Sequence, residues 1–198
     1  MFANRYTAFI DACTLARVLP RNPLLSLAEA DFFRIRWSTP VLDETERAIS
    51  GMLHRRGNTL EAAQEKAAHQ IQQMRAAFED AEVVDFEHLL PTASDLPDPN
   101  DAHVLAAALK TQAAAIVTDN LKDFPANILG RLKIEARSSD DFIADTIALD
   151  TGRAVSTIRR LRERFKRPET TPEEFPLSLE AANLLATADS LRPHLDSL

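Results

Sequence analysis

Acidic residues lie at the ends of short apolar segments in this chain, where strands and helices would bring them together. Asp11 ends the apolar run Phe9-Ile10, Glu44 lies early in a helical pattern, Asp101 opens an Ala/Val/Leu helix, and Asp123 follows the apolar run 114–117. Carboxylates gathered at one place repel each other and need a cation, and hard divalent cations prefer oxygen ligands. The pattern therefore indicates a Mg²⁺ or Mn²⁺ site of the kind that hydrolyses phosphodiester bonds.

The elements that would position these acids alternate between strand and helix patterns. Apolar runs predict strands at 6–10, 35–37, 82–86, 114–117 and 133–136, and helical periodicity predicts helices at 24–33, 40–53, 60–78 and 101–111. Alternating strands and helices indicate an α/β fold with a parallel sheet and three layers, α/β/α. Ligands on such sheets bind at the carboxyl ends of the strands, where Asp11 and the segment 118–123 lie.

Several polar residues fit helix capping. Thr39 before Pro40 predicts a helix start, and Thr59 after Gly57-Asn58 predicts another. Asp98 before Pro99 also fits an N-cap, and Asp101 would then be the third helical residue. Negative charge is favourable at a helix N-terminus, so capping alone would explain both acids.

The chain changes character after residue 137. No strand pattern follows, and helical periodicity continues to a final helical stretch at 177–195, which Pro193 breaks. We therefore expect two domains, an α/β domain at 1–137 and a helical C-terminal extension at 138–198. Basic residues gather at 153–167, either as a solvated helix face or as a patch that binds phosphate or a partner.

Composition excludes several other classes of protein. The formal net charge is −7, and the single cysteine, Cys13, excludes an internal disulfide and fits a reducing cytoplasm. The N-terminus has no long apolar stretch typical of a signal peptide, and no apolar run is long enough to span a membrane. Cys13 is expected to be a small buried residue, since no base is evident beside it. His103 is expected to be structural, since it lies two residues after Asp101 and so points to a different helix face.

Four segments in order closely resemble the PIN-domain nucleases, in particular the VapC-type toxins of bacterial toxin–antitoxin pairs. These segments are Phe9–Leu15, Arg36–Arg47, Leu96–Ala108 and Ile116–Pro125, which together span about the first 135 residues. The tail from Ser138 resembles the helical extension of one subgroup of these toxins. Asp11–Thr14 also faintly resembles the haloacid dehalogenase phosphatases, but that family needs a second Asp where Cys13 stands.

The resemblance to PIN domains implies a role for each matching residue. The catalytic and metal-binding acids would be Asp11, Glu44, Asp101 and Asp123, with Glu46 as a weaker candidate than Glu44. Thr118 and Asn120 would be polar supports that orient the acids, while the role of Asp119 stays open. The implied cofactor is Mg²⁺ or Mn²⁺.

The same resemblance implies an activity and partners. The chain would be a cytoplasmic endoribonuclease that leaves 5′-phosphate and 3′-hydroxyl ends, with Arg47 and the 153–167 cluster holding the RNA backbone. A small antitoxin would inhibit it by inserting a basic side chain among the acids, and PIN domains often pair as homodimers. The alternative is a catalytically silent PIN-like module kept for binding.

Overall fold

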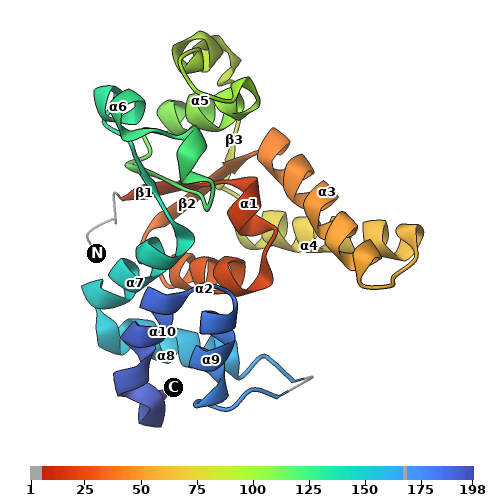
Figure 1. Cartoon of the computed structure of the whole chain (residues 1–198), viewed down its shortest axis with the longest axis vertical. Helices are drawn as coiled ribbons and strands as arrows, with labels where there is room; N and C mark the ends of the chain where they lie inside the picture. The colour runs from red at the N-terminus through yellow and green to blue at the C-terminus, as the bar shows by residue number, and fades with distance from the viewer. Residues whose placement is uncertain (1–5, 167–168) are drawn as a thin grey trace. The chain divides into compact units, whose positions relative to one another are not determined.

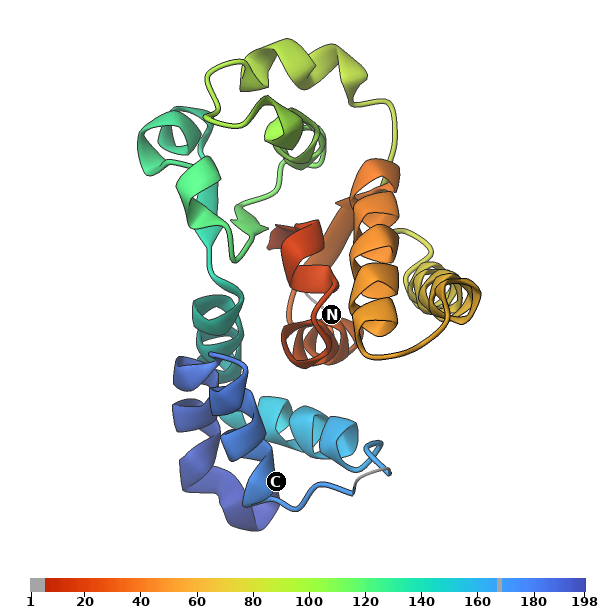
Figure 2. The same cartoon turned by 45° about the vertical axis from the view of Figure 1, so that its right-hand side comes forward.

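The computed structural model describes residues 6–166 and 169–198, and the chain divides into two compact units. The first, the sheet unit, comprises residues 6–17 and Arg34–Arg137. The second, the helical unit, comprises Val18–Phe33 and Ser138–Leu198. Figures 1 and 2 show the elements of both units. No helix in the described parts of the chain has both the length and the apolar character that crossing a membrane requires.

A five-stranded, wholly parallel sheet forms the centre of the sheet unit, with the strand order β3-β2-β1-β4-β5. Its strands are β1 (Thr7–Ile10), β2 (Arg34–Ser38), β3 (Glu82–Val83), β4 (Ala115–Val117) and β5 (Glu135–Arg137). All five lie close to the strands predicted from sequence. The prediction of β3 was too long, because the backbone at Asp85 turns into the left-handed region (φ 56°), which an extended strand cannot contain.

The register of the two central strands decides which residues meet at the carboxyl edge of the sheet. Ile10 of β1 pairs with Val117 of β4, so the next residues, Asp11 and Thr118, are also neighbours. The backbone N–H of Asp11 continues the pairing by donating to the carbonyl of Val117 at 3.0 Å. Both strands are fully buried apart from the slightly exposed Thr7. The pairing of β1 with β4 thus places the carboxylate of Asp11 and the hydroxyl of Thr118 side by side at the end of two buried strands.

Helices complete the three-layer α/β/α arrangement. They are α1 (Ala12–Leu15), α3 (Thr39–Arg55), α4 (Leu60–Ala77), α5 (Ala102–Lys110) and α6 (Ala126–Leu129). The apolar helix α5 packs on β1, β2 and β4, while α3 packs on β2, α1 and α4. The core of this unit contains Trp37, Phe9 and Ile116, and Phe78 meets the Trp37 ring edge to face at 5.7 Å.

Helices α3 and α4 form a hairpin whose turn agrees with the sequence. Gly57 has a φ of +94°, a conformation open to glycine, and Thr59 caps α4 by accepting from the N–H of Ala62 at 3.2 Å. The expected cap at Thr39 was wrong by one position. Ser38 occupies the N-cap of α3 without a side-chain hydrogen bond, and Thr39 is the first helical residue.

The segment before α5 contains two short 3₁₀ helices, η1 (Glu87–Ala93) and η2 (Pro99–Asp101). The predicted cap at Asp98 is confirmed, since its carboxylate accepts from the N–H of Asn100 at 2.9 Å. It caps η2, which leads directly into α5. Two further 3₁₀ helices, η3 (Leu121–Asp123) and η4 (Gly130–Leu132), flank α6.

The helical unit gathers α2 (Val18–Glu29), α7 (Ser139–Leu149), α8 (Thr151–Arg162), α9 (Glu174–Ala181), α10 (Leu185–Leu191) and η5 (Arg192–Ser197). Helix α2 packs on α7 and α8, although it precedes them by more than a hundred residues. Phe33 and Phe142 meet edge to face at 4.9 Å, and the Asp140 carboxylate caps α10 by accepting from two N–H groups. The single final helix expected at 177–195 was wrong, because Asn183 adopts a φ of 62° and separates α9 from α10.

Candidate active site

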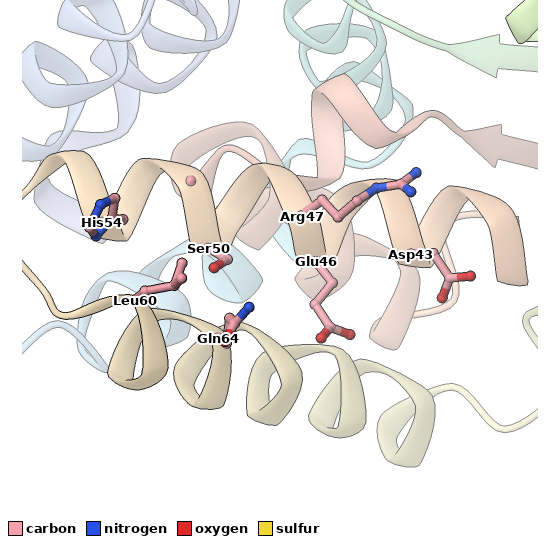
Figure 3. A pocket seen from close by; sticks show the side chains of 8 residues that line it. Asp43, Glu46, Arg47, Ser50, His54, Leu60 and Gln64 are labelled. Atoms are coloured by element: carbon pink, nitrogen blue, oxygen red, sulfur yellow. The ribbon is translucent and has the colours of Figure 1, made fainter.

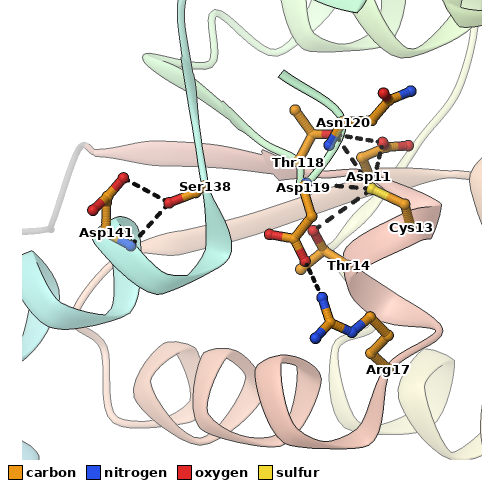
Figure 4. A network of polar contacts seen from close by, with 9 residues as sticks. All are labelled: Asp11, Cys13, Thr14, Arg17, Thr118, Asp119, Asn120, Ser138 and Asp141. Atoms are coloured by element: carbon orange, nitrogen blue, oxygen red, sulfur yellow. Dashed lines mark hydrogen bonds and ion pairs between the residues drawn. The ribbon is translucent and has the colours of Figure 1, made fainter. Parts of the chain in front are cut away.

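Asp11 is held in place by donors from the helix that follows it and from Thr118, the residue after β4. The residue is 6% exposed and caps α1, where its Oδ1 accepts from the N–H of Ala12 at 2.6 Å. Its Oδ2 accepts from the Thr118 hydroxyl at 2.8 Å, and the same hydroxyl accepts from the N–H of Asn120 at 3.1 Å. Figure 4 shows this network at the ends of β1 and β4. Asp11 is therefore fixed before any ligand arrives.

Cys13 belongs to the same network but is not activated. Its thiol donates to Oδ2 of Asp11 at 3.1 Å and lies 3.3 Å from the Thr118 hydroxyl, while the N–H of Asp119 donates to its sulfur. Burial, together with the charge of Asp11, raises the pKa of the Cys13 thiol to about 12. A thiol with such a pKa stays protonated at neutral pH and is a poor nucleophile.

Glu44 on α3 faces His103 on α5. The imidazole Nδ1 lies 2.7 Å from the carbonyl of Asn100, which can only accept from it, and Nε2 is turned toward Glu44. Nε2 lies 3.6 Å from Oε2 of Glu44 and makes no hydrogen bond within residues 6–166 and 169–198. Burial raises the pKa of Glu44, the imidazole opposes this rise, and the charge of Asp11 adds to it.

Asp101 carries the clearest sign of crowded negative charge. Burial and, in decreasing order, the charges of Asp11, Asp98 and Asp123 together raise its pKa to about 6. Its Oδ2 is buried and accepts no hydrogen bond from any described residue. A buried carboxylate oxygen without a donor is costly, and a cation is one way to satisfy it.

Three carboxylates come within the spacing of a metal site. Oxygens of Asp98, Asp101 and Asp123 all lie within 4.8 Å of one another, and all three residues are half-buried. Asp98 is the N-cap of the short η2, Asp101 is the last residue of η2, and Asp123 ends η3 after β4. Asn120 donates to Oδ2 of Asp123, which orients that carboxylate.

Two acids near the site point elsewhere. Asp119 forms an ion pair with Arg17 at 2.9 Å, as Figure 4 shows. Glu46 lines a pocket of about 570 Å³ between α3 and α4, together with Asp43, Arg47, Ser50, Gly51, His54, Leu60 and Gln64 (Figure 3). Glu44 and Glu46 are two residues apart on α3 and so leave the helix on different faces. Glu44 lies near His103, and the charge of Asp11 helps to raise its pKa.

The structure thus relates the predicted acids to one another. Asp11 raises the pKa of both Glu44 and Asp101, and Asp123 raises that of Asp101. Asp98 also joins this group, which the sequence-based reasoning missed because capping already accounted for it. The signal was present, since Asp98 and Asp101 are spaced so that a single 3₁₀ turn brings them together. The approach of His103 to Glu44 was missed as well, because it depends on how α5 packs.

The basic cluster expected at 153–167 is largely engaged within the helical unit. Arg153 lies over the Phe32 ring at 4.2 Å, Arg159 pairs with Glu163 at 2.9 Å, and Arg162 donates to the carbonyls of Thr170 and Leu198. Arg167 lies outside the described residues. Arg160 on α8 and Arg164 just past the end of α8 are exposed.

Comparisons with known proteins identify the family of the chain. Residues 7–122 match the PIN domain family, and residues 139–193 match the VapC50 C-terminal domain family. A Mycobacterium tuberculosis protein named "Putative ribonuclease VapC50" is 39% identical over 75 residues, which cover 38% of this chain and 44% of that protein. No solved structure matches the chain. The chain belongs to the PIN-domain family, as a VapC-type member with a helical C-terminal extension.

Proposed function

We propose that the chain is a metal-dependent endoribonuclease that hydrolyses RNA phosphodiester bonds in the cytoplasm, and that it is the toxin of a toxin–antitoxin pair. The observation that carries the proposal is Asp101, whose pKa is raised to about 6 and whose buried Oδ2 lacks a donor among the described residues. Such a carboxylate, surrounded by other carboxylates, suits a divalent cation. The family match and the similarity to a protein named as a ribonuclease support the choice of RNA.

The residues fit Mg²⁺ or Mn²⁺ better than softer metals, because the donors gathered here are carboxylate oxygens. Asp11, Glu44, Asp101 and Asp123 would hold the cation, with Asp98 beside them. When bound, the cation would lower the pKa of a water molecule and stabilise negative charge on the phosphate.

The other polar side chains would orient the acids. Thr118 fixes Asp11, Asn120 fixes Asp123, and His103 faces Glu44. These partners lie outside the set of metal-holding acids, and groups of this kind orient ligands and tune metal affinity. One of the carboxylates would accept the proton of the attacking water.

The proposed antitoxin would exploit the same negative charge. An arginine inserted among Asp98, Asp101 and Asp123 would pair with several carboxylates at once and occupy the place of the cation. An antitoxin of this kind would therefore compete with Mn²⁺. We also propose that the chain forms a homodimer.

The test is RNA cleavage with Mg²⁺, with Mn²⁺ and with EDTA, using a matched pair of variants on α3. Glu44→Gln should abolish cleavage and weaken Mn²⁺ binding in calorimetry, as should Asp11→Asn. Glu46→Gln removes the same charge two residues away and should retain both. Full cleavage by Asp11→Asn would reject the assignment. Carboxylate-dependent Mn²⁺ binding without cleavage of any RNA would instead favour the silent binding module.

A further inference from the structure

A small cavity lies between α2 and α8, entirely within the helical unit. It has a volume of about 220 Å³. Its lining consists of Ser26 and Glu29 of α2 with Ala30 just after that helix, and of Thr157 and Arg160 of α8 with Arg164 just after that helix. One water molecule takes up about 30 Å³ in the liquid, so the cavity has room for a small anion with several waters. The two hydroxyl residues are buried, whereas the two arginines are exposed.

The cavity lies on the most basic part of an otherwise acidic chain. Residues 151–166 contain six arginines and lysines and one glutamate, whereas the whole chain has a net charge of −7. Arg153, Arg159 and Arg162 are occupied by Phe32, Glu163 and two carbonyl groups, as described above. Arg160 and Arg164 are the basic residues of this stretch that line the cavity.

These two arginines are poorly neutralised. Arg160 lies on α8 and Arg164 lies just past the end of that helix, and the two like charges repel each other where they line the same cavity. Arg160 donates to the Thr157 hydroxyl at 3.3 Å and has no carboxylate partner among residues 6–166 and 169–198. Arg164 lies 3.8 Å from Glu29, but both side chains are about two-thirds exposed, so this ion pair contributes little.

We propose that this cavity binds a phosphate group of single-stranded RNA, and that the helical unit thereby helps to hold the substrate backbone. Two guanidinium groups can clamp phosphate oxygens with paired N–H donors. Ser26 supplies a further hydroxyl donor at the buried end of the cavity. Glu29 opposes binding, because its carboxylate competes with the phosphate for Arg164.

The choice of RNA rests on the proposed nuclease function, whereas the phosphate site does not. The test therefore measures binding without cleavage. A short fluorescein-labelled single-stranded RNA is titrated with the full chain in EDTA, and anisotropy gives the affinity between about 50 and 200 mM salt. Each phosphate contact with single-stranded nucleic acid contributes about 0.7 to the slope of log affinity against log salt. Replacing both arginines, R160Q with R164Q, should lower the slope by about 0.7 and weaken binding roughly fivefold at about 0.1 M salt.

Matched variants separate this site from general charge effects. R159Q removes the same charge from the same helix, but from a residue paired with Glu163, and should leave the slope unchanged. R160K with R164K keeps the charge and should keep most of the slope. E29Q should strengthen binding, because it removes the competing carboxylate. An equal loss with R159Q and with R160Q/R164Q would overturn the proposal, as would no loss with either.

A second arm identifies the source of the phosphate. Inorganic phosphate is titrated into the full chain and into R160Q/R164Q by calorimetry. One outcome would assign the cavity to free phosphate and overturn the RNA proposal. In that outcome R160Q/R164Q loses the binding of inorganic phosphate, but its RNA affinity has the same salt slope as that of the unsubstituted chain. In another outcome the chain cleaves no RNA, while R160Q/R164Q still lowers the salt slope of RNA binding. That outcome would support the phosphate site and reject the nuclease function.

Discussion

The Thr118 hydroxyl donates to Oδ2 of Asp11 at 2.8 Å, although the two residues are 107 positions apart in the sequence. The bond exists because β1 and β4 pair in parallel with Ile10 opposite Val117, so that both strands end at the same point of the sheet. Thr118 is fully buried, which leaves no water to replace its hydroxyl.

Replacing Thr118 with Val should therefore damage the site more than the fold. The substitution keeps the shape of the side chain but leaves Oδ2 of Asp11 with only the weak thiol donor of Cys13. We expect a loss of roughly 1 kcal/mol in the free energy of unfolding and about a tenfold loss in Mn²⁺ affinity. Thr118→Ser retains the hydroxyl and should keep the affinity within about twofold; equal affinities of all three proteins by calorimetry would contradict the role of this bond.

Much of this arrangement could be predicted from the sequence. The apolar runs 6–10 and 114–117 fixed the two central strands, and the parallel α/β pattern placed Asp11 and the segment 118–123 at one edge of the sheet. Predicting which side chains meet there was harder. Asp119 and Asn120 are adjacent in sequence, but one pairs with Arg17 and the other with Asp123. That choice depends on the turn into η3, which carries no periodic signal.

The packing of helices that are distant in the chain could not be predicted from the sequence. Nothing in the pattern of residues 18–33 shows that α2 packs with α7 and α8, since an amphipathic helix has an apolar face wherever its partner lies in the chain. Likewise, the sequence distance between Glu44 and His103 gives no sign that Nε2 of the imidazole would lie 3.6 Å from the carboxylate. Both relationships are products of tertiary structure.

Replacing Asp101 with Asn should stabilise the protein when no metal is present. The pKa of Asp101 rises from 3.8 to about 6 on folding, so the folded state binds more protons than the unfolded state between these values. Stability is therefore lost as pH rises from about 4 through 6, and the loss is complete above about pH 7. Asp101→Asn removes this penalty, which solvent screening limits to roughly 1 kcal/mol, and should raise the midpoint of thermal unfolding at about pH 8 in EDTA by roughly 2–4 °C.

The same variant should respond differently to Mn²⁺. The unsubstituted protein gains stability from a bound cation by mass action, whereas Asp101→Asn should gain much less. Scanning calorimetry with and without Mn²⁺ measures both effects. A variant that melts lower in EDTA would show that Asp101 is not crowded by negative charge. A variant that gains as much from Mn²⁺ as the unsubstituted protein would show that Asp101 does not hold the cation.

Metal affinity should depend on pH in the range where Asp101 titrates. Protons and the cation compete for the same carboxylates, and the pKa values of Asp101 and Glu44 are both raised. Mn²⁺ affinity should rise about tenfold for each pH unit up to about pH 6 and level off above about pH 7. Calorimetric titrations between about pH 5 and 8 measure the curve, and a constant affinity across this range would contradict competition at Asp101.

Two aspartates four positions apart should behave as opposites. Asp123 lies within ligand spacing of Asp98 and Asp101, whereas Asp119 is paired with Arg17 at 2.9 Å. Asp123→Asn should weaken Mn²⁺ binding by about tenfold or more, because a carboxylate of the cluster is lost. Asp119→Asn should change Mn²⁺ affinity by less than about twofold and cost at most about 1 kcal/mol in stability, the range of an exposed ion pair. Calorimetry with Mn²⁺ and thermal unfolding separate the two effects. Equal losses of Mn²⁺ affinity would mean that Asp119 leaves Arg17 to join the cluster when the cation binds, and Arg17→Gln would then raise the affinity.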